Sequence, residues 1–272
     1  MQNATIFCLC LHNKVLPIIK KLEYIPVGLG ADNYSKEWLK DNTLENISFK
    51  NKHYGEYTFH YWLWKNYLDQ LDDTWVGFCQ YRKFWCLEKN SQSETLHKLK
   101  SLVLKEIPEE YDSYETILGE PLLIDQVKIM KLIKRGLKLV IKNPAFLFNK
   151  RKRNIKFHFD MWHGEEYLTE AIKLLDTENR NDFNHFVNNN NSFNPHNMFI
   201  CKSKDILKNY YETVFQWLSR CEELFGNRNL SGYGQTRIYG FLAERFMSYW
   251  FQKNTKFKTM PIIFHDIRKD IN

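Results

Sequence analysis

The sequence predicts an α/β fold, in which short buried strands alternate with amphipathic helices. Two apolar, β-rich runs at 5–11 and 75–79 are typical of strands in a parallel sheet. Between them, Tyr57, Tyr61, Trp64 and Leu68 recur at three- and four-residue spacing, as on one face of a helix. With 272 residues, 43% of them hydrophobic, the chain can form one large domain or one domain with an insertion.

The N-terminal half supplies the start of the predicted sheet. A first strand is expected at 5–11, a short helix or loop at 15–22, and a second strand at 24–27 that ends at Gly28 and Gly30. A polar loop follows at 32–48, then the helix at 54–71 and the strand at 75–79. This order of strand, helix and strand is the repeating unit of an α/β sheet.

The C-terminal half is predicted to be mostly helical, at 93–105, 165–175, 206–224 and 236–251, with short strands at 116–118 and 198–201. Loops are expected at 188–191 and 226–234. Segment 122–156 interleaves basic residues with Ile, Met and Leu and ends in KRKR at 150–153. Its other basic residues include Lys128, Lys131, Lys134, Arg135 and Lys138. We interpret 122–156 as a basic amphipathic insertion within a single domain that spans 1–272.

The charge and the cysteines restrict the class of protein only broadly. The net charge of +7 is compatible with nucleic acid, an anionic membrane or a phosphorylated ligand as a partner. The six cysteines show no CxxC spacing, which favours reduced, buried thiols in a cytoplasmic protein over a zinc site. The start of the chain lacks the features of a secretory signal, and no apolar run approaches the ~20 residues of a membrane span. We therefore expect any membrane contact to be peripheral.

The segment VGFCQYRKFW at 76–85 is the strongest candidate for a binding site. An apolar run that reads as a buried strand ends there in a basic, aromatic cluster. Open α/β sheets bind ligands beyond the carboxyl ends of their strands. Arg82 could hold a phosphate through two parallel hydrogen bonds in a dry site, and Lys83 would add a weaker point charge at the rim. The alternative is a solvated strand end.

Two upstream segments could join this site. In GLGADN at 28–33, the glycines would let the backbone approach a ligand, and Asp32 could accept hydrogen bonds from ribose hydroxyls. An ordinary turn is the alternative. Four-residue spacing puts Glu56 and His60 on one face of the predicted helix, and Lys65 follows on the same helix. A core helix with one polar side explains the same pattern.

Candidate acid–base groups occur in the second half. FHFDMWHGEEYL at 157–168 brings together His158, Asp160, His163, Glu165 and Glu166. Such a group could supply a general base or bind a metal. The alternative is a polar helix start with glutamates in its first turn. In GQTRIYGFLAERF, Arg237 and Glu244 are seven residues apart and share one side of a helix, as an ion pair or as a ligand clamp. No DxD or ExD triplet follows the strand at 75–79, so we expect no cofactor and no divalent metal.

Five segments, in this order, resemble a bacterial family found in capsular and lipopolysaccharide gene clusters. The family was catalogued as a domain of unknown function and is regarded as a glycosyltransferase family that includes galactofuranosyltransferases. The resemblance runs from residue 6 to about residue 250. The matching segments are IPVGLGADN, NISFKNKHYGEYTFHYWLWKN, VGFCQYRKFW, NPHNMFICKSK and GQTRIYGFLAERF. Two residues depart from the pattern. Gln80 replaces a histidine and keeps only a binding role, and Lys83 replaces an arginine and loses its fork geometry.

The resemblance implies a GT-A-like, Rossmann-type α/β sandwich with a mostly helical insertion and C-terminal helices. It also implies transfer of a hexose, with galactofuranose favoured, from a UDP-sugar to a growing capsular or lipopolysaccharide glycan. Arg82 and Lys83 would stabilise the leaving diphosphate in place of a metal. The acceptor would be lipid-linked or an oligosaccharide, and the basic insertion would face the anionic inner leaflet of the cytoplasmic membrane.

These considerations assign a role to each candidate residue. The predicted catalytic carboxylates are Asp160 and Glu166, placed ahead of Glu244. The predicted donor-binding residues are His12, Gly28, Asp32, Asn33, Glu56, Lys65, Gln80, Arg82 and Lys83. The predicted acceptor-binding or supporting residues are His163, His196, Asn197 and Arg237. Two other classes fit part of the pattern: a nucleic-acid-binding protein that uses the basic insertion, and a phosphotransferase acting on the same polysaccharide.

Overall fold

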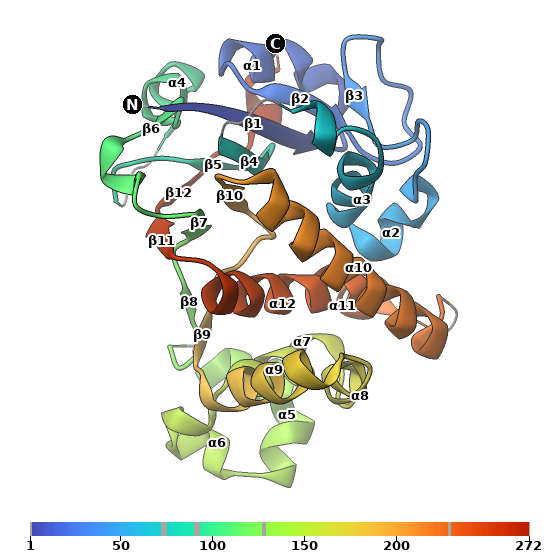
Figure 1. Cartoon of the computed structure of the whole chain (residues 1–272). Coiled ribbons are helices and arrows are strands. Elements are labelled where there is room, and N and C mark those ends of the chain that lie inside the picture. Colours follow the sequence, from blue (N-terminus) through green and yellow to red (C-terminus); the bar gives the residue numbers. More distant parts are fainter. Residues whose placement is uncertain (1, 72–74, 90–92, 127–128, 228–229, 272) are drawn as a thin grey trace.

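The computed structural model describes the chain except for residues 1, 72–74, 90–92, 127–128, 228–229 and 272 (Figure 1). The sheet is mixed and has the strand order β11-β7-β10-β4-β1-β2-β3. At its centre, β1 (Gln2–Cys10) pairs in parallel with β2 (Ile25–Gly28) and β4 (Trp75–Gln80), and β2 pairs in parallel with β3 (Leu39–Lys40). The predicted strands are therefore present, and their carboxyl ends meet at one edge.

The other half of the sheet contains antiparallel strands. β10 (Phe199–Cys201) is antiparallel to both β4 and β7 (Thr116–Gly119), while β11 (Phe257–Met260) is parallel to β7. β5 (Lys83–Trp85) forms a hairpin with β4 and pairs with β12 (Ile262–Phe264). Since Gln80 pairs with Lys83, only Tyr81 and Arg82 form the hairpin turn. β6 (Glu106–Ile107) pairs with the start of β1.

Helices cover both faces of the sheet. On one face, α3 (Tyr57–Asn66), α10 (Lys204–Phe225) and α12 (Ile238–Asn254) share a core with Phe7, Phe78 and Phe199. On the other, α1 (Leu16–Lys21) and α4 (Leu96–Leu102) pack near Cys8, Cys79 and Ile200. α2 (Asn51–Tyr54) precedes α3, and α11 (Gly232–Thr236) precedes α12. The 3-10 turns are Asn13–Val15, Ser48–Lys50, Leu68–Gln70, Glu109–Tyr111, Lys150–Lys152 and Ile267–Asp270.

A helical excursion leaves the sheet through a two-stranded stem. β8 (Leu122–Leu123) pairs antiparallel with β9 (Ser192–Phe193), and the chain between them lies beyond α12, at the bottom of Figure 1. Its helices are α5 (Ile129–Lys142), α6 (Ala145–Phe148), α7 (Ile155–His163), α8 (Tyr167–Lys173) and α9 (Thr177–Asn189). The predicted insertion at 122–156 is thus only the first part of an excursion that spans 124–191.

Several local predictions need correction. The helix expected at 54–71 breaks at Gly55, which has a φ of 59° and separates α2 from α3. The asparagines at 188 and 189, expected in a loop, are the last residues of α9. β11 and β12, near the end of the chain, were not predicted from the sequence. The expectation for the cysteines is confirmed, since all six lie within the described residues, buried and free of disulfides. No helix among the described residues is long and apolar enough to span a membrane.

Candidate active site

A polar cavity of about 160 Å³ lies where the parallel strands end. Leu11 follows β1, Leu29 follows β2, and Gln80 is the last residue of β4. Open α/β sheets place ligands at this edge because the ends of neighbouring strands leave a crevice there. The cavity is lined by eight of the predicted site residues, which come from four separate stretches of the chain: Glu56, Gln80, Arg82, Lys83, His196, Asn197, Arg237 and Glu244.

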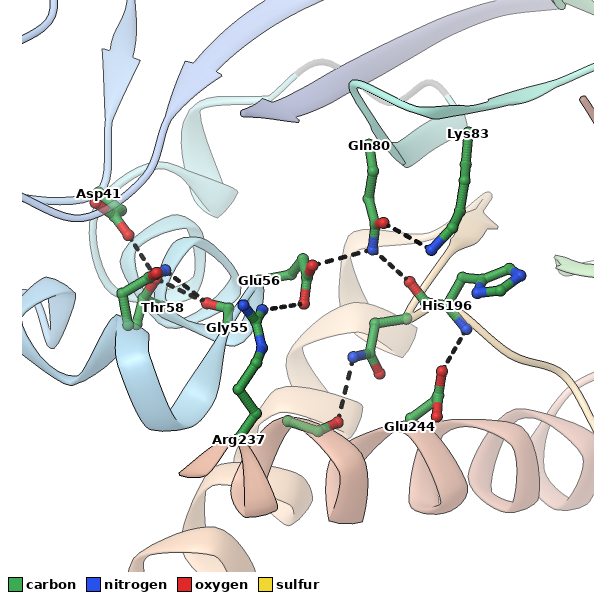
Figure 2. A network of polar contacts seen from close by, with 12 residues as sticks. Asp41, Gly55, Glu56, Thr58, Gln80, Lys83, His196, Arg237 and Glu244 are labelled. Carbon is green, nitrogen blue, oxygen red and sulfur yellow. Dashed lines mark hydrogen bonds and ion pairs between the residues drawn. The ribbon is translucent and has the colours of Figure 1, made fainter. Parts of the chain in front are cut away.

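A continuous polar network crosses this cavity (Figure 2). The carboxylate of Glu56 accepts hydrogen bonds from Gln80 Nε2 at 3.1 Å and from Arg237 Nη2 at 3.2 Å. Gln80 Nε2 also donates to the backbone oxygen of His196 at 2.8 Å, and its Oε1 accepts from Lys83 Nζ at 3.0 Å. Gln80, a departure from the family pattern, is itself uncharged and joins the start of α3, the hairpin and the His196 loop through hydrogen bonds to the Glu56 carboxylate, the Lys83 ammonium and a backbone carbonyl.

Gly55 allows this network to form. Its φ of 59° lies in the left-handed region, and a Cβ at this position would lie 2.1 Å from Arg237 Nη2. The guanidinium therefore occupies space that only a glycine leaves open. Arg237 forms its ion pair with Glu56 rather than with Glu244, its partner in the sequence-based alternative of an internal ion pair. Glu244 instead pairs with its neighbour Arg245.

The loop before β10 has an unusual backbone. His196 and Asn197 have φ values of 81° and 52°, a conformation that residues other than glycine rarely adopt. The loop is held by His196 N, which donates to Glu244 Oε1 at 2.6 Å, and by Asn197 Nδ2, which donates to Gly240 O at 3.2 Å. Asn197 Oδ1 is buried in the cavity wall without a hydrogen-bond partner among the described residues. Strained backbone and unpaired polar atoms are concentrated at functional sites.

Lys83 and Arg82 exchange the positions that the sequence analysis gave them. Lys83 is half-buried and faces the cavity, because its pairing with Gln80 in the hairpin puts both side chains on the same side. Burial lowers the pKa of Lys83, while the nearby carboxylates of Glu56 and Glu244 oppose that shift. Arg82 lies exposed in the hairpin turn, with its guanidinium 4.9 Å from the ring centre of Tyr81. The expectation of a buried Arg82 and a lysine at the rim is therefore wrong.

Leu29 of the GLGADN segment lines this cavity, but the predicted donor-binding residues Gly28, Asp32 and Asn33 do not. A Cβ on Gly28 would lie 2.6 Å from the ring of Tyr34, so this glycine makes room for a core tyrosine. Asp32 and Asn33 are exposed on the following loop. His12 lies near Arg268, its Nε2 3.3 Å from the guanidinium, and packs edge-on against Tyr81.

Lys65 lies away from the polar cavity, whereas the buried Asp41 supports one side of it. Lys65 is exposed on α3 and lies over the ring of Trp64 in a separate cavity, away from the strand ends. Asp41, which was not predicted from the sequence, is fully buried and accepts a hydrogen bond from Gly30 N at 2.8 Å. It also accepts one from Thr58 Oγ1 (Figure 2). Burial raises the pKa of Asp41 to about 6. Asp41 therefore fixes the loop after β2 to the start of α3.

The three predicted catalytic carboxylates lie in three different environments. Glu166 is exposed at the start of α8, with a φ of 74°, and lines neither the polar cavity nor the larger cavity beside it. Asp160 lies on α7 and lines only the larger cavity, together with His163. Glu244 lies on α12 and lines both cavities. The sequence analysis missed Tyr233 and Phe241, which also line both; their aromatic spacing around the Gly-rich loop was the available signal.

The family of this chain is identified by comparing its sequence with those of known proteins. The profile of a family described as a domain of unknown function (DUF4422) matches residues 6–255, and the chain therefore belongs to that family. No curated protein matches the chain.

The solved structures show the fold. The apo structure of the bifunctional glycosyltransferase WbbM matches with a TM-score of 0.66 and 22% identity, over 96% of this chain and 45% of that chain. The chain thus spans less than half the length of WbbM. The mannosyltransferase Ktr4p from S. cerevisiae and core-mannan synthase A from Aspergillus fumigatus each match at 12% identity and a TM-score of 0.38, over 96% of this chain and 70% and 74% of theirs. The likeness to WbbM confirms the predicted α/β, GT-A-like fold class.

The comparisons correct the expectation about metals. The missing DxD triplet led to the expectation of no divalent metal, but the Aspergillus structure is described as an Mn/GDP form. Within the part of the chain that the structure describes, no group of three or more His, Cys, Asp or Glu side chains could hold a metal ion.

Proposed function

We propose that this DUF4422 protein is a glycosyltransferase that binds the diphosphate of a nucleotide-sugar donor in the polar cavity at the strand ends. One observation carries the proposal: the cavity places a half-buried ammonium group, that of Lys83, where an α/β sheet binds its ligand. Lys83 donates to the amide of Gln80 and forms no ion pair with another described residue. Its charge is therefore available to a phosphate oxygen, and Arg82 adds a second cation at the entrance.

The reaction divides between the two sides of the cavity. An acceptor hydroxyl oxygen forms a bond to the anomeric carbon while the bond from that carbon to the diphosphate breaks. The diphosphate leaves with both bonding electrons, and Lys83 and Arg82 stabilise its developing negative charge. The hydroxyl proton passes to a general base, for which Glu244 is the best placed of the three predicted carboxylates because it borders both cavities.

The identity of the donor sugar and of the glycan product is inferred from the motif resemblance. The donor is a UDP-hexose, with galactofuranose favoured, and the product is a capsular or lipopolysaccharide glycan. Gln80 cannot exchange a proton at neutral pH, so it orients Glu56 and Lys83 through the hydrogen bonds described above. Departure of the diphosphate therefore depends on the positioned cations, and deprotonation of the acceptor hydroxyl depends on a carboxylate.

The start of the excursion is suited to an anionic membrane surface, at the cytoplasmic face. Met130, Leu137 and Ile141 on α5 are 77%, 51% and 70% exposed, and Phe148 at the end of α6 is 86% exposed. Lys138 and Lys142 are exposed beside them. Exposed apolar side chains among lysines are typical of helices that lie at a lipid interface. The KRKR run contributes less than its composition indicates. Arg153 is 2% exposed and donates to the backbone oxygens of Phe146 and Leu147.

Titration calorimetry with UDP and UDP-hexoses, in the presence of Mn²⁺ or Mg²⁺, tests the donor assignment. Wild-type protein should bind UDP, and Lys83→Ala should weaken that binding. Lys65→Ala is the matched control, because it removes an exposed lysine that lines a different cavity. Absence of UDP and UDP-sugar binding at millimolar concentration would remove the proposal, as would equal effects of the two substitutions.

A further inference from the structure

A second, larger cavity adjoins the polar one. It has a volume of about 730 Å³, within the range of small-molecule sites, and lies between α7 of the excursion and the segment of α11 and α12. His196, Tyr233, Phe241 and Glu244 line both cavities. A molecule held in the larger cavity therefore has access to the carboxylate that borders the donor cavity.

The walls of this cavity are aromatic. The rings of His163 and Phe241 stack with their centres 4.0 Å apart, and Tyr233 packs edge-on against Phe241 at 5.7 Å. Trp162, half-buried on α7, and Phe193 complete the apolar lining. Burial lowers the pKa of His163 to about 2, so its ring is neutral at physiological pH and acts as a further flat surface. Flat, largely uncharged walls suit the apolar C–H face of a sugar ring.

Two buried polar atoms in the same walls have no partner. Asp160 has a side chain 7% exposed, and its Oδ1 is buried without a hydrogen-bond partner among the described residues. The Nε of Arg245, whose side chain is 2% exposed, is likewise unpartnered within the described chain. Asp160 Oδ2 accepts from Lys156 Nζ at 2.5 Å, so only one of its oxygens is used. Buried polar groups almost always have partners, and an exception calls for a ligand or a water.

The position of α7 against α11 is tightly defined. A Cβ on Gly234 would lie 2.2 Å from the backbone oxygen of Trp162, so this glycine permits the closest approach of the two helices. Gly234 O accepts from His163 Nδ1 at 3.1 Å. These two contacts join α7 of the excursion to α11, which directly precedes the helix that carries Glu244.

We propose that the larger cavity binds the terminal sugar of the acceptor, a hydroxylated saccharide whose face packs against Trp162 and Tyr233. Asp160 Oδ1 accepts a hydrogen bond from one sugar hydroxyl, and another hydroxyl reaches Glu244. Asp160 is then an acceptor-binding residue rather than the general base. This inference rests on the proposed function for the identity of the donor, but the binding of a saccharide in this cavity does not.

Saturation-transfer NMR with methyl hexosides and a galactose disaccharide, recorded with and without saturating UDP, tests this inference. The wild-type protein should give saccharide signals that UDP does not displace. Asp160→Asn should weaken saccharide binding about tenfold or more, since it replaces a charged acceptor. Lys156→Gln is the matched control: it removes the same ion pair but keeps the carboxylate, and it should bind saccharides nearly as wild type does.

A second pair of variants addresses the aromatic wall without risk to the fold. Tyr233 is 71% exposed at the mouth of the cavity, and Phe49 is 77% exposed and lines neither cavity. Tyr233→Ala should lose saccharide signal, and Phe49→Ala should retain it. Displacement of the saccharides by UDP, equal losses in Asp160→Asn and Lys156→Gln, or absence of saccharide signal in the wild type would overturn the inference. Saccharide binding without UDP binding would instead refute the proposed function and leave the inference standing.

Discussion

Replacement of Lys83 by methionine removes a charge and keeps the length of the side chain, so it isolates the electrostatic contribution of this residue. The ammonium is half-buried, donates to Gln80 at 3.0 Å and forms no ion pair with another described residue. A hydrogen bond between charged groups contributes about 1.5–3 kcal/mol. Lys83→Met should therefore raise the Kd of UDP about 10- to 150-fold. Arg82 is exposed in the hairpin turn, and exposed charge pairs contribute only ~0–1 kcal/mol. Arg82→Met should change the Kd at most about fivefold.

Calorimetry at two salt concentrations separates the two contributions. Salt screens exposed charges strongly and buried charges weakly, so the effect of Arg82→Met should shrink at high salt while that of Lys83→Met persists. Lys65→Met serves as the control for an unrelated lysine. An Arg82→Met effect equal to or larger than that of Lys83→Met would refute the reasoning, because it would mean that the phosphates lie outside the hairpin rather than inside the cavity.

Four further outcomes are expected. Glu244→Gln should reduce turnover by roughly 10²–10⁴ in a UDP-release assay and leave UDP affinity unchanged, whereas the exposed Glu166→Gln should keep near-wild-type turnover. Gly55→Ala should lower the melting temperature and weaken UDP binding, because a Cβ would displace Arg237 from Glu56; Gly232→Ala, with a φ of 69° and open space around it, should show only the backbone cost of about 1–2 kcal/mol. The native state retains the Asp41 proton up to about pH 6, above the usual value of 3.8, so this residue should cost stability as pH rises through that interval. Asp41→Asn should flatten that part of the stability curve in urea unfolding. Wild-type protein should float with anionic vesicles at low salt, and an Ile141→Asp variant should float less while binding UDP normally; wild-type protein that ignores such vesicles would contradict the membrane proposal.

Much of the sheet could be predicted because its strands are continuous apolar runs. β1, β2 and β4 occur where the sequence predicted them, within a few residues, and the edge that they form holds the candidate site. β11 and β12 could not be found in the same way. Apart from Met260 and Ile263, their residues are only partly buried or exposed. They form strands because β7 and β5 lie beside them, which is tertiary information.

The candidate site was predictable as a set of segments but not as a set of positions. The exchange between Arg82 and Lys83 depends on hairpin register, since a two-residue turn directs Lys83 inward and leaves Arg82 in solvent. The pairing of Arg237 with Glu56 joins residues 181 positions apart and depends on the space left by Gly55. Asp41 shows no pattern in the sequence, because a single buried carboxylate within a polar loop differs from its neighbours only once the loop is folded.

The architecture separates the two halves of the proposed reaction. Residues at the strand ends and in the hairpin line the proposed donor cavity, and residues of α7 line the proposed acceptor cavity. The stem of β8 and β9 closes the excursion at its base, so the chain between residues 124 and 191 begins and ends at the same place on the sheet. Changes in the excursion can therefore alter the proposed acceptor cavity without shifting the register of the strands that border the proposed donor cavity. Glu244 lies between the two cavities on α12, which belongs to neither the hairpin nor the excursion. A base held on this third element can keep one chemistry while acceptor specificity changes, which is the arrangement expected of a transferase fold adapted to different glycans.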